Sequence, residues 1–170
     1  MQLRDYQREA IDSVYRYFGE HPTDVTRNPV IAMPTGTGKA VVIAGFTQEV
    51  LTQWPSQRIM MATHVKELVD QNADKLTTIW PQAPLGIFSA GLKEKTFGMP
   101  ITFGNIQSIA SALKKDPNAF GHIDILLVDE CHMVSPSENA SYQFVIKTLR
   151  LINPRLRVIG LSATPYRLGL

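Results

Sequence analysis

Apolar residues along this chain fall into two patterns, short continuous runs and longer segments with helical spacing. The runs are rich in Val and Ile, and we expect strands at residues 30–33, 58–62, 85–88, 101–103, 125–129 and 158–162. Because these runs are continuous rather than alternating, they are typical of a sheet that is buried on both faces.

Segments with helical spacing lie between several of the runs. Their apolar or buried positions are Ala10, Val14, Tyr17 and Phe18, then Val65, Leu68, Val69, Asn72, Leu76 and Ile79, and later Tyr142, Val145, Ile146, Leu149 and Ile152. Strand and helix therefore alternate, which predicts an α/β domain with a mostly parallel sheet. Ligands of such a domain bind at the loops that leave the carboxyl ends of the strands. Turn-rich residues 21–29, 81–84 and 114–121 are expected to be surface loops.

Length and composition suit a single domain, because 170 residues with 44% hydrophobic content can bury a sizeable core. The single cysteine, Cys131, excludes an internal disulfide and a zinc site of the usual cysteine-rich kind. No stretch approaches the roughly 18 apolar residues of a membrane span. We therefore expect no membrane partner and a cytoplasmic location, with the nucleoid if the source is bacterial. A formal charge of +2 permits a nucleic-acid partner without requiring one.

A glycine-rich motif at residues 33–40 follows the first expected strand and opens an apolar helical run, which is the context of a Walker A phosphate loop. Glycines let several backbone N–H groups converge on phosphate oxygens, and the following helix adds positive potential there. Lys39 would reach the β- and γ-phosphates of a bound nucleotide. The predicted nucleotide-binding residues of the loop are Pro34, Thr35, Gly36, Thr37, Gly38, Lys39 and Ala40.

Ala40 departs from the usual motif, in which Ser or Thr follows the lysine and its hydroxyl binds the Mg²⁺ of the nucleotide. A methyl group cannot coordinate a metal, although water can take the vacant position. We therefore expect impaired hydrolysis with nucleotide binding at least partly retained.

Two adjacent carboxylates, Asp129 and Glu130, end a strongly apolar strand, where charge is costly without a partner. This arrangement predicts Walker B chemistry, in which Asp129 holds Mg²⁺ directly or through water and Glu130 deprotonates the attacking water. Both residues are candidate metal ligands. His132 is a candidate for linking nucleotide state to the segment at residues 162–164, since its ring can both donate and accept hydrogen bonds. Cys131 is interpreted as a packing residue.

Gln7, the phosphate loop, the Asp-Glu-Cys-His box at residues 129–132 and the Ser-Ala-Thr segment at 162–164 occur in the order of superfamily 2 DEAD/DEAH-like helicases, and the chain resembles them over essentially its whole length. More narrowly, Arg-Asp-Tyr-Gln-Arg-Glu-Ala at 4–10 and the stretch at 160–169 are similar to bacterial RadD-type enzymes, XPB-like helicases and type III restriction helicase subunits. The resemblance implies a three-layer RecA-like P-loop NTPase domain.

The resemblance also implies roles for residues outside the two Walker motifs. Gln7 would read adenine, which favours ATP over GTP, and Arg4 would flank the same base. Ser162, Ala163 and Thr164 would couple nucleotide state to nucleic acid. Contacts with the nucleic-acid backbone would come from residues after the second and fourth expected strands, namely Thr63, His64, Lys66, Gly104 and Asn105. As an alternative, polar residues at these helix starts would act only as caps.

We expect residues 1–170 to form the first lobe of an ATP- and Mg²⁺-dependent helicase or translocase, with the second RecA-like lobe outside this chain. The similarity to RadD-type enzymes favours DNA over RNA and a role in repair or recombination. One alternative is a hydrolysis-impaired, nucleotide-responsive binding module. Another is a metabolic P-loop phosphotransferase, which would have no evident use for the Ser-Ala-Thr segment.

Overall fold

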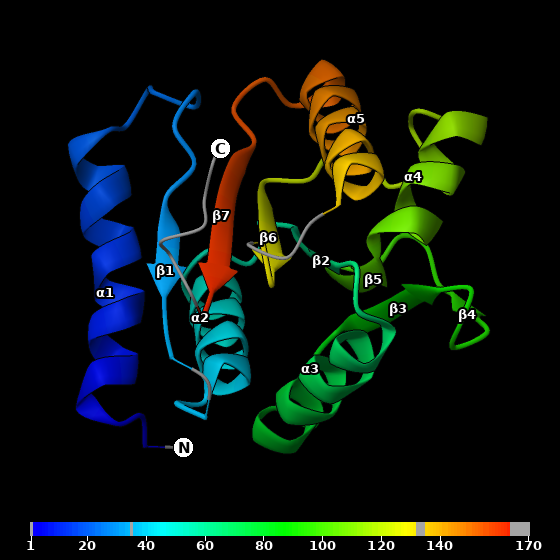
Figure 1. Ribbon diagram of the computed structural model, residues 1–170. Helices are drawn as coiled ribbons and strands as arrows, with labels where there is room; N and C mark the ends of the chain where they lie inside the picture. The colour runs from blue at the N-terminus through cyan, green and yellow to red at the C-terminus, as the bar shows by residue number, and fades with distance from the viewer. Residues whose placement is uncertain (1, 35, 132–134, 164–170) are drawn as a thin grey trace.

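A computed structural model describes residues 2–34, 36–131 and 135–163, with the elements shown in Figure 1. In chain order they are α1 (Asp5–Glu20), β1 (Val30–Ala32), α2 (Lys39–Gln53), β2 (Ile59–Thr63), α3 (Lys66–Ile79), β3 (Leu85–Ser89), β4 (Glu94–Lys95), β5 (Ile101–Asn105), α4 (Ile106–Lys115), β6 (Ile125–Asp129), α5 (Pro136–Ile152) and β7 (Arg157–Ser162). None of the helices in these ranges is long and apolar enough to cross a membrane.

Within these ranges the strands form one seven-stranded sheet in the order β1-β7-β6-β2-β5-β3-β4. All pairs are parallel except β3 with β4. The carboxyl ends of the parallel strands therefore lie along one edge, where ligands of such sheets bind. The predicted mostly parallel α/β sheet is confirmed.

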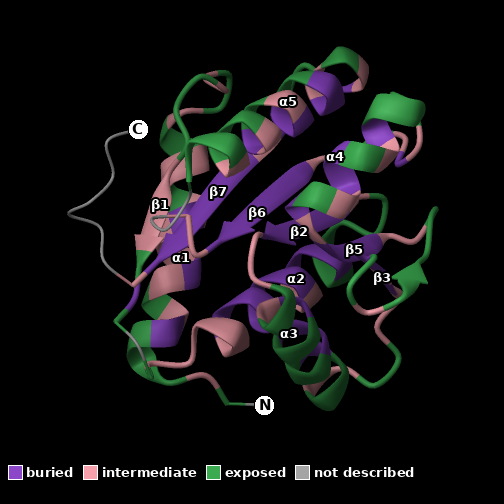
Figure 2. Cartoon of the chain, turned by 45° about the vertical axis from the view of Figure 1, so that its right-hand side comes forward, coloured by how far each residue is buried: buried purple, intermediate pink, exposed green. Residues whose placement is uncertain are grey.

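Helices cover both faces of the sheet, so the domain has three layers (Figure 1). One hydrophobic cluster joins α1, α2 and α3 to the sheet, and a second joins α4 and α5 to the opposite face. Neighbouring residues of one strand alternate between the clusters; in β6, Leu127 belongs to the first and Leu126 to the second. Figure 2 shows the central strands β7, β6, β2 and β5 as buried between helices whose outer surfaces are exposed. Burial on both faces explains the continuous apolar runs.

The six expected strands are all present, with ends that differ by at most two residues. Two elements were not predicted. α4 was missed although its buried residues, Ile106, Ile109, Ala110 and Leu113, follow helical spacing. β4 was missed because both of its residues are exposed and its pairing depends on the edge of β3.

Candidate nucleotide site and nucleic-acid edge

The glycine-rich loop passes directly from β1 into α2. β1 is held beside β7, and the N–H of Met33 donates to the carbonyl of Ser162 at 2.9 Å. Gly36 and Gly38 adopt φ angles of +82° and +84°, a left-handed conformation that side chains other than glycine rarely adopt. α2 then begins at Lys39, so the first N–H groups of the helix face the loop without intrahelical acceptors. This is the geometry that a phosphate group requires.

Gln7 fastens α1 to the phosphate loop. Its Nε2 donates to the carbonyl of Thr37 at 3.1 Å, and its Oε1 accepts from the N–H of Arg4 at 3.0 Å. A Cβ on Gly38 would lie 2.5 Å from this Nε2, so only glycine lets the helix approach the loop this closely. Because a primary amide has two donors and two lone pairs, Gln7 keeps one donor and one acceptor after these two bonds. The remaining donor and acceptor suit the hydrogen-bonding edge of adenine. Recognition of adenine by Gln7 stays a prediction.

Lys39 joins the loop to the end of β6. Its Nζ lies 3.1 Å from Oδ1 of Asp129 and also contacts Oε1 of Glu130. Burial alone would lower the pKa of Lys39, but the neighbouring carboxylates outweigh burial and raise this pKa above its ordinary value. The lysine therefore stays charged, and the structure brings together the three side chains that the two Walker motifs predicted.

Glu130 owes its position to an unusual backbone conformation. Its φ is +56°, in the left-handed region, which costs a non-glycine residue about 1–3 kcal/mol. Its N–H donates to Oδ1 of Asp129 at 2.9 Å, and the N–H of Cys131 donates to the carbonyl of Leu161 at 3.1 Å. These bonds turn the chain sharply after the strand and direct Glu130 toward Lys39.

Asn72 is the residue of this site that the sequence did not identify as functional. It lies on α3 and is 2% exposed, and its Nδ2 donates to Oδ2 of Asp129 at 2.9 Å. Asp129 is only 1% exposed, so this bond orients a carboxylate that water hardly reaches. Asn72 is therefore a positioning residue. In the sequence, only its polar side chain on the apolar face of a helix indicates that it needs a buried partner.

The donor set here suits Mg²⁺ bound together with nucleotide phosphates. Mg²⁺ is usually held by one or two carboxylates, phosphate oxygens and water, and Asp129 and Glu130 offer two adjacent carboxylates beside the phosphate loop. Among the described residues no cluster of three or more His, Cys, Asp or Glu side chains forms a metal site by itself. Ala40 lies in the first turn of α2 and supplies no oxygen from its side chain.

At the carboxyl edge of the sheet, two of the predicted nucleic-acid contacts are buried. The side chain of Thr63 is fully buried, and its hydroxyl accepts from the N–H of Val65 at 3.2 Å. Gly104 lies in β5 between β2 and β3, where a Cβ would be 2.7 Å from the carbonyl oxygen of Phe88, so packing favours glycine here. Contact with nucleic acid by Thr63 and Gly104 stays a prediction.

The other predicted contact residues lie closer to the surface. Lys66 is exposed in the first turn of α3, while His64 and Asn105 are half-buried. The Oδ1 of Asn105 accepts from the N–H of Gln107 at 3.0 Å, so Asn105 caps α4, as the alternative interpretation expected. Contact with nucleic acid by Lys66, His64 and Asn105 stays a prediction.

Ser162 is buried at the end of β7, and Ala163 follows it half-buried. Thr35, His132 and Thr164, the remaining predicted site residues, lie outside the described residues. Near this end of the sheet, burial raises the pKa of the Cys131 thiol to about 11. A raised pKa disfavours the thiolate, which agrees with a packing role for Cys131.

Comparison with known proteins identifies the family of this chain. Residues 1–167 match the family model described as "Type III restriction enzyme, res subunit". The DNA helicase fml1 of Schizosaccharomyces pombe is 27% identical over 171 residues, covering 96% of this chain and 19% of fml1. Hel308 of Thermoplasma acidophilum is 24% identical, covering 96% of this chain and 23% of Hel308. The chain thus spans about a fifth to a quarter of these relatives.

Solved structures share the fold at low sequence identity. The UvsW helicase of bacteriophage T4 superposes with a TM-score of 0.67 at 19% identity, covering 99% of this chain and 56% of that structure. The type ISP restriction-modification enzyme LlaGI has a TM-score of 0.66 at 15% identity, covering 97% of this chain and 18% of that structure. These structures confirm the predicted RecA-like architecture. The family model and the helicase relatives confirm the resemblance to superfamily 2. The chain belongs to the family of type III restriction enzyme res subunits.

Proposed function

We propose that this chain is the ATP-binding motor lobe of a helicase or translocase that acts on DNA. The proposal rests on one observation: Lys39, at the end of the phosphate loop, contacts the carboxylates of Asp129 and Glu130 at the end of β6. This meeting occurs at the edge of the sheet where Lys66 and Asn105 also lie. One edge therefore combines the chemistry of phosphate transfer with residues suited to nucleic-acid phosphates.

Each residue of the site has a definite task in this proposal. The phosphate loop and Gln7 hold ATP, and Lys39 turns from the carboxylates to the β- and γ-phosphates. Mg²⁺, when bound through Asp129, would neutralise charge on the phosphates. Glu130 orients the attacking water and accepts its proton. Because Ala40 leaves the metal without a hydroxyl ligand, turnover is expected to be slower than with serine at this position.

Movement requires a second RecA-like lobe, which we propose for the whole protein. Closure of that lobe over the nucleotide would complete the site and exclude water. Ser162, Ala163 and Thr164, with His132, would transmit closure to the bound strand. By itself, the first lobe should bind ATP modestly and hydrolyse it poorly.

Several relatives favour DNA as the partner. The names of fml1 and Hel308 describe them as ATP-dependent DNA helicases. LlaGI was solved with a DNA substrate mimic, and the Sulfolobus solfataricus SWI2/SNF2 ATPase core was solved with double-stranded DNA. These relatives support DNA as the partner. On the similarity to RadD-type enzymes, we further propose DNA repair or recombination, in the cytoplasm, as the setting of this motor.

Ala40 favours a second candidate function, a nucleotide-responsive DNA-binding module in which hydrolysis is impaired. In that case nucleotide binding would change the affinity for DNA without repeated turnover. The position of Glu130 beside Lys39 argues for a working motor instead, since a pure binding module has no use for a group that activates water.

The test is ATP hydrolysis by the whole protein, with and without single-stranded DNA, for the parent and for Ala40→Ser. Ala140→Ser, at an exposed position of α5, controls for the change of alanine to serine itself. Hydrolysis that DNA stimulates in the parent supports the motor. Hydrolysis that appears only with Ala40→Ser supports the second candidate. If neither the parent nor the Ala40→Ser variant responds to DNA, the helicase proposal is refuted.

A further inference from the structure

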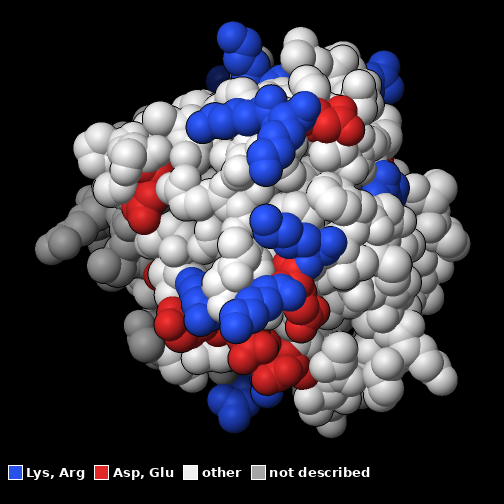
Figure 3. Space-filling model, turned by 90° about the vertical axis from the view of Figure 1, so that its right-hand side faces the viewer, with Lys and Arg blue, Asp and Glu red and all other residues white. Residues whose placement is uncertain are grey.

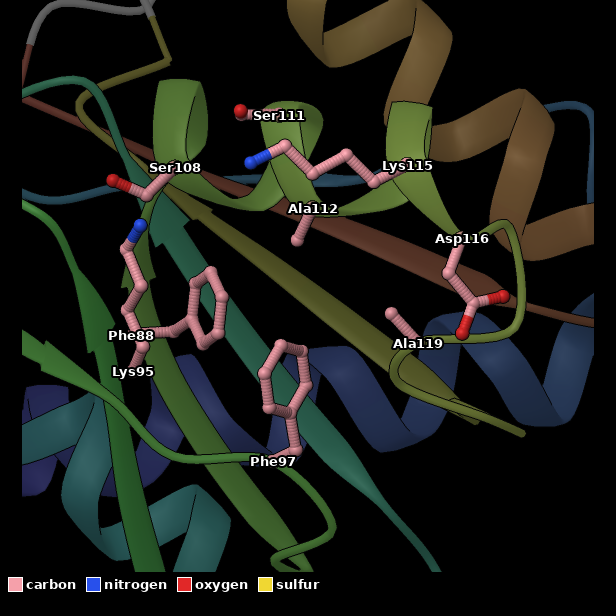
Figure 4. Close-up of a pocket in the computed structure, with 9 residues that line it drawn as sticks. All are labelled: Phe88, Lys95, Phe97, Ser108, Ser111, Ala112, Lys115, Asp116 and Ala119. Atoms are coloured by element: carbon pink, nitrogen blue, oxygen red, sulfur yellow. The ribbon is translucent and has the colours of Figure 1, made fainter.

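A pocket of about 330 Å³ lies between α4 and the segment that contains β4, away from the phosphate loop (Figure 4). Phe88 and Phe97 line one side of it, and α4 lines the other with Ser108 and Lys115 among its residues. Lys95 of β4 completes this side of the pocket. None of these residues belongs to the nucleotide site, and each belongs to a described range.

The apolar wall of the pocket ends in an exposed aromatic ring. Phe97 is 50% exposed, whereas Phe88 and Phe120 behind it are at most 2% exposed. The ring centre of Phe97 lies 4.8 Å from that of Phe88 and 5.4 Å from that of Phe120. These contacts hold the exposed ring in place, so it can stack on a ligand with little further loss of side-chain freedom.

The polar wall carries positive charge and hydroxyl groups. In Figure 4 the amino groups of Lys95 and Lys115 point toward the end of the pocket where Ser108 lies. Asp116 lines the other end, where its carboxylate accepts from the N–H of Asn118 at 2.9 Å. Figure 3 shows this side of the molecule, on which Lys and Arg side chains lie among Asp and Glu side chains. An anionic group is therefore favoured at the Ser108 end.

The turn after β3 contacts both the pocket and the edge where nucleic acid is proposed to bind. On the pocket side, the N–H of Ala90 donates to Oγ of Ser108 at 3.0 Å. On the other side, the side chain of Lys66 packs so closely over Gly91 that a Cβ there would lie 2.9 Å from the lysine Cδ. A strand that contacts Lys66 would have to pass this turn to reach the pocket.

We propose that this pocket binds one nucleotide of a single DNA strand, with the base stacked on Phe97 and the neighbouring phosphates beside Lys95 and Lys115. The inference rests on the proposed function, since the strand must reach the edge of the sheet first. One pocket that holds an exposed ring and two ammonium groups suits stacking together with phosphate contact, the combination that binds single strands without sequence preference. The carboxylates of an acidic peptide could pair with Lys95 and Lys115, but such a peptide carries no base that would stack on the ring of Phe97.

Two variants of the whole protein test the two halves of this site. Phe97→Leu keeps an apolar side chain against Phe88 but removes the flat ring. It should weaken binding of a labelled single-stranded oligonucleotide by about tenfold. The double variant Lys95→Gln with Lys115→Gln should make the slope of log affinity against log salt concentration less negative by roughly 0.7–1.4. Each phosphate that is no longer neutralised accounts for about 0.7 of this change.

An oligonucleotide that lacks bases separates stacking from folding. Phe97→Leu should weaken binding of the normal strand and leave binding of the abasic strand unchanged. Equal weakening of both strands would overturn the stacking role, because the ring would then act only through the fold. The control for Lys95→Gln with Lys115→Gln is a second double variant, Lys75→Gln with Arg155→Gln. It removes the same charge from two exposed positions outside the pocket and should keep the salt dependence of the parent.

Failure of this inference can be distinguished from failure of the proposed function. If the parent binds the strand and DNA stimulates its hydrolysis, but the pocket variants match the parent in affinity and salt dependence, only the pocket proposal is overturned. If the parent binds no single strand, the pocket proposal is overturned, and hydrolysis without stimulation by any DNA is what overturns the proposed function.

Discussion

Replacing Asn72 with leucine should destabilise the fold and impair binding of the metal-bound nucleotide. The side chain donates at 2.9 Å to Asp129, and both residues are at most 2% exposed. A hydrogen bond to a charged group contributes about 1.5–3 kcal/mol, and leucine offers the buried carboxylate oxygen no donor. We therefore expect the free energy of unfolding to fall by about 1.5–3 kcal/mol, with any gain from the apolar leucine reducing this loss.

The functional effect follows from the freedom that Asp129 would gain. Outer residues that orient metal ligands typically change metal affinity by about 10–100-fold. The Mg²⁺ concentration that gives half-maximal binding of a fluorescent ATP analogue should therefore rise by about tenfold or more in Asn72→Leu. Binding measured without Mg²⁺ should change much less, because Asn72 touches the carboxylate and not the phosphate loop.

A matched variant at the opposite edge of the sheet controls for stability. Asn153 is also buried, and its Nδ2 donates to the carbonyl of Ile123 at 2.9 Å. Asn153→Leu should destabilise the fold without changing the Mg²⁺ dependence. The positioning role is refuted if Asn72→Leu leaves the Mg²⁺ dependence as in the parent, or if Asn153→Leu shifts it equally.

Four further outcomes follow from single residues. Gly104→Ala should lower the free energy of unfolding by about 1–3 kcal/mol in denaturant titrations, because its Cβ would meet the carbonyl of Phe88 at 2.7 Å. Glu130→Gln should keep ATP binding but slow hydrolysis by about 100-fold or more, and turnover equal to the parent would contradict its role as base. Ser135→Ala should cost about 1 kcal/mol of stability by removing the α5 cap. Hydrogen bonds from Ser135 lower the pKa of Glu138. The stability that Glu138 adds should therefore be present at neutral pH and be lost as the pH falls through this lowered pKa. The difference in unfolding free energy between the parent and Glu138→Gln, taken from denaturant titrations at several pH values, measures this loss.

The central strands could be predicted from the sequence because burial on both faces leaves a continuous apolar run. β6, for example, is buried at every residue. β4 could not be predicted, since Glu94 and Lys95 are exposed and carry no periodic signal. α4 left a usable signal in Asn105 and the apolar spacing that follows it. That signal is short, because a helix of 10 residues makes only about three turns.

The residues that meet around Lys39 could be predicted because each motif is local: glycines in one loop and carboxylates at the end of one strand. The exposure of the predicted nucleic-acid contacts could not be predicted, since position along the chain does not show which way a side chain faces. Thr63 and Gly104 follow the family order but are buried by neighbouring elements. Exposure, which only the packed sheet determines, separates them from Lys66.

The contacts that complete the nucleotide site join residues far apart in the chain: Gln7 meets the loop 30 residues later, and Asn72 meets Asp129 after 57 residues. A parallel sheet produces such meetings because each strand returns to the same edge after its helix. Local patterns cannot show these partners, but they do show that a partner is needed. A polar residue on the apolar face of a helix must be hydrogen-bonded once it is buried. When a nearby strand ends in a buried carboxylate, that carboxylate is the partner to expect, and Asn72 could have been assigned in this way.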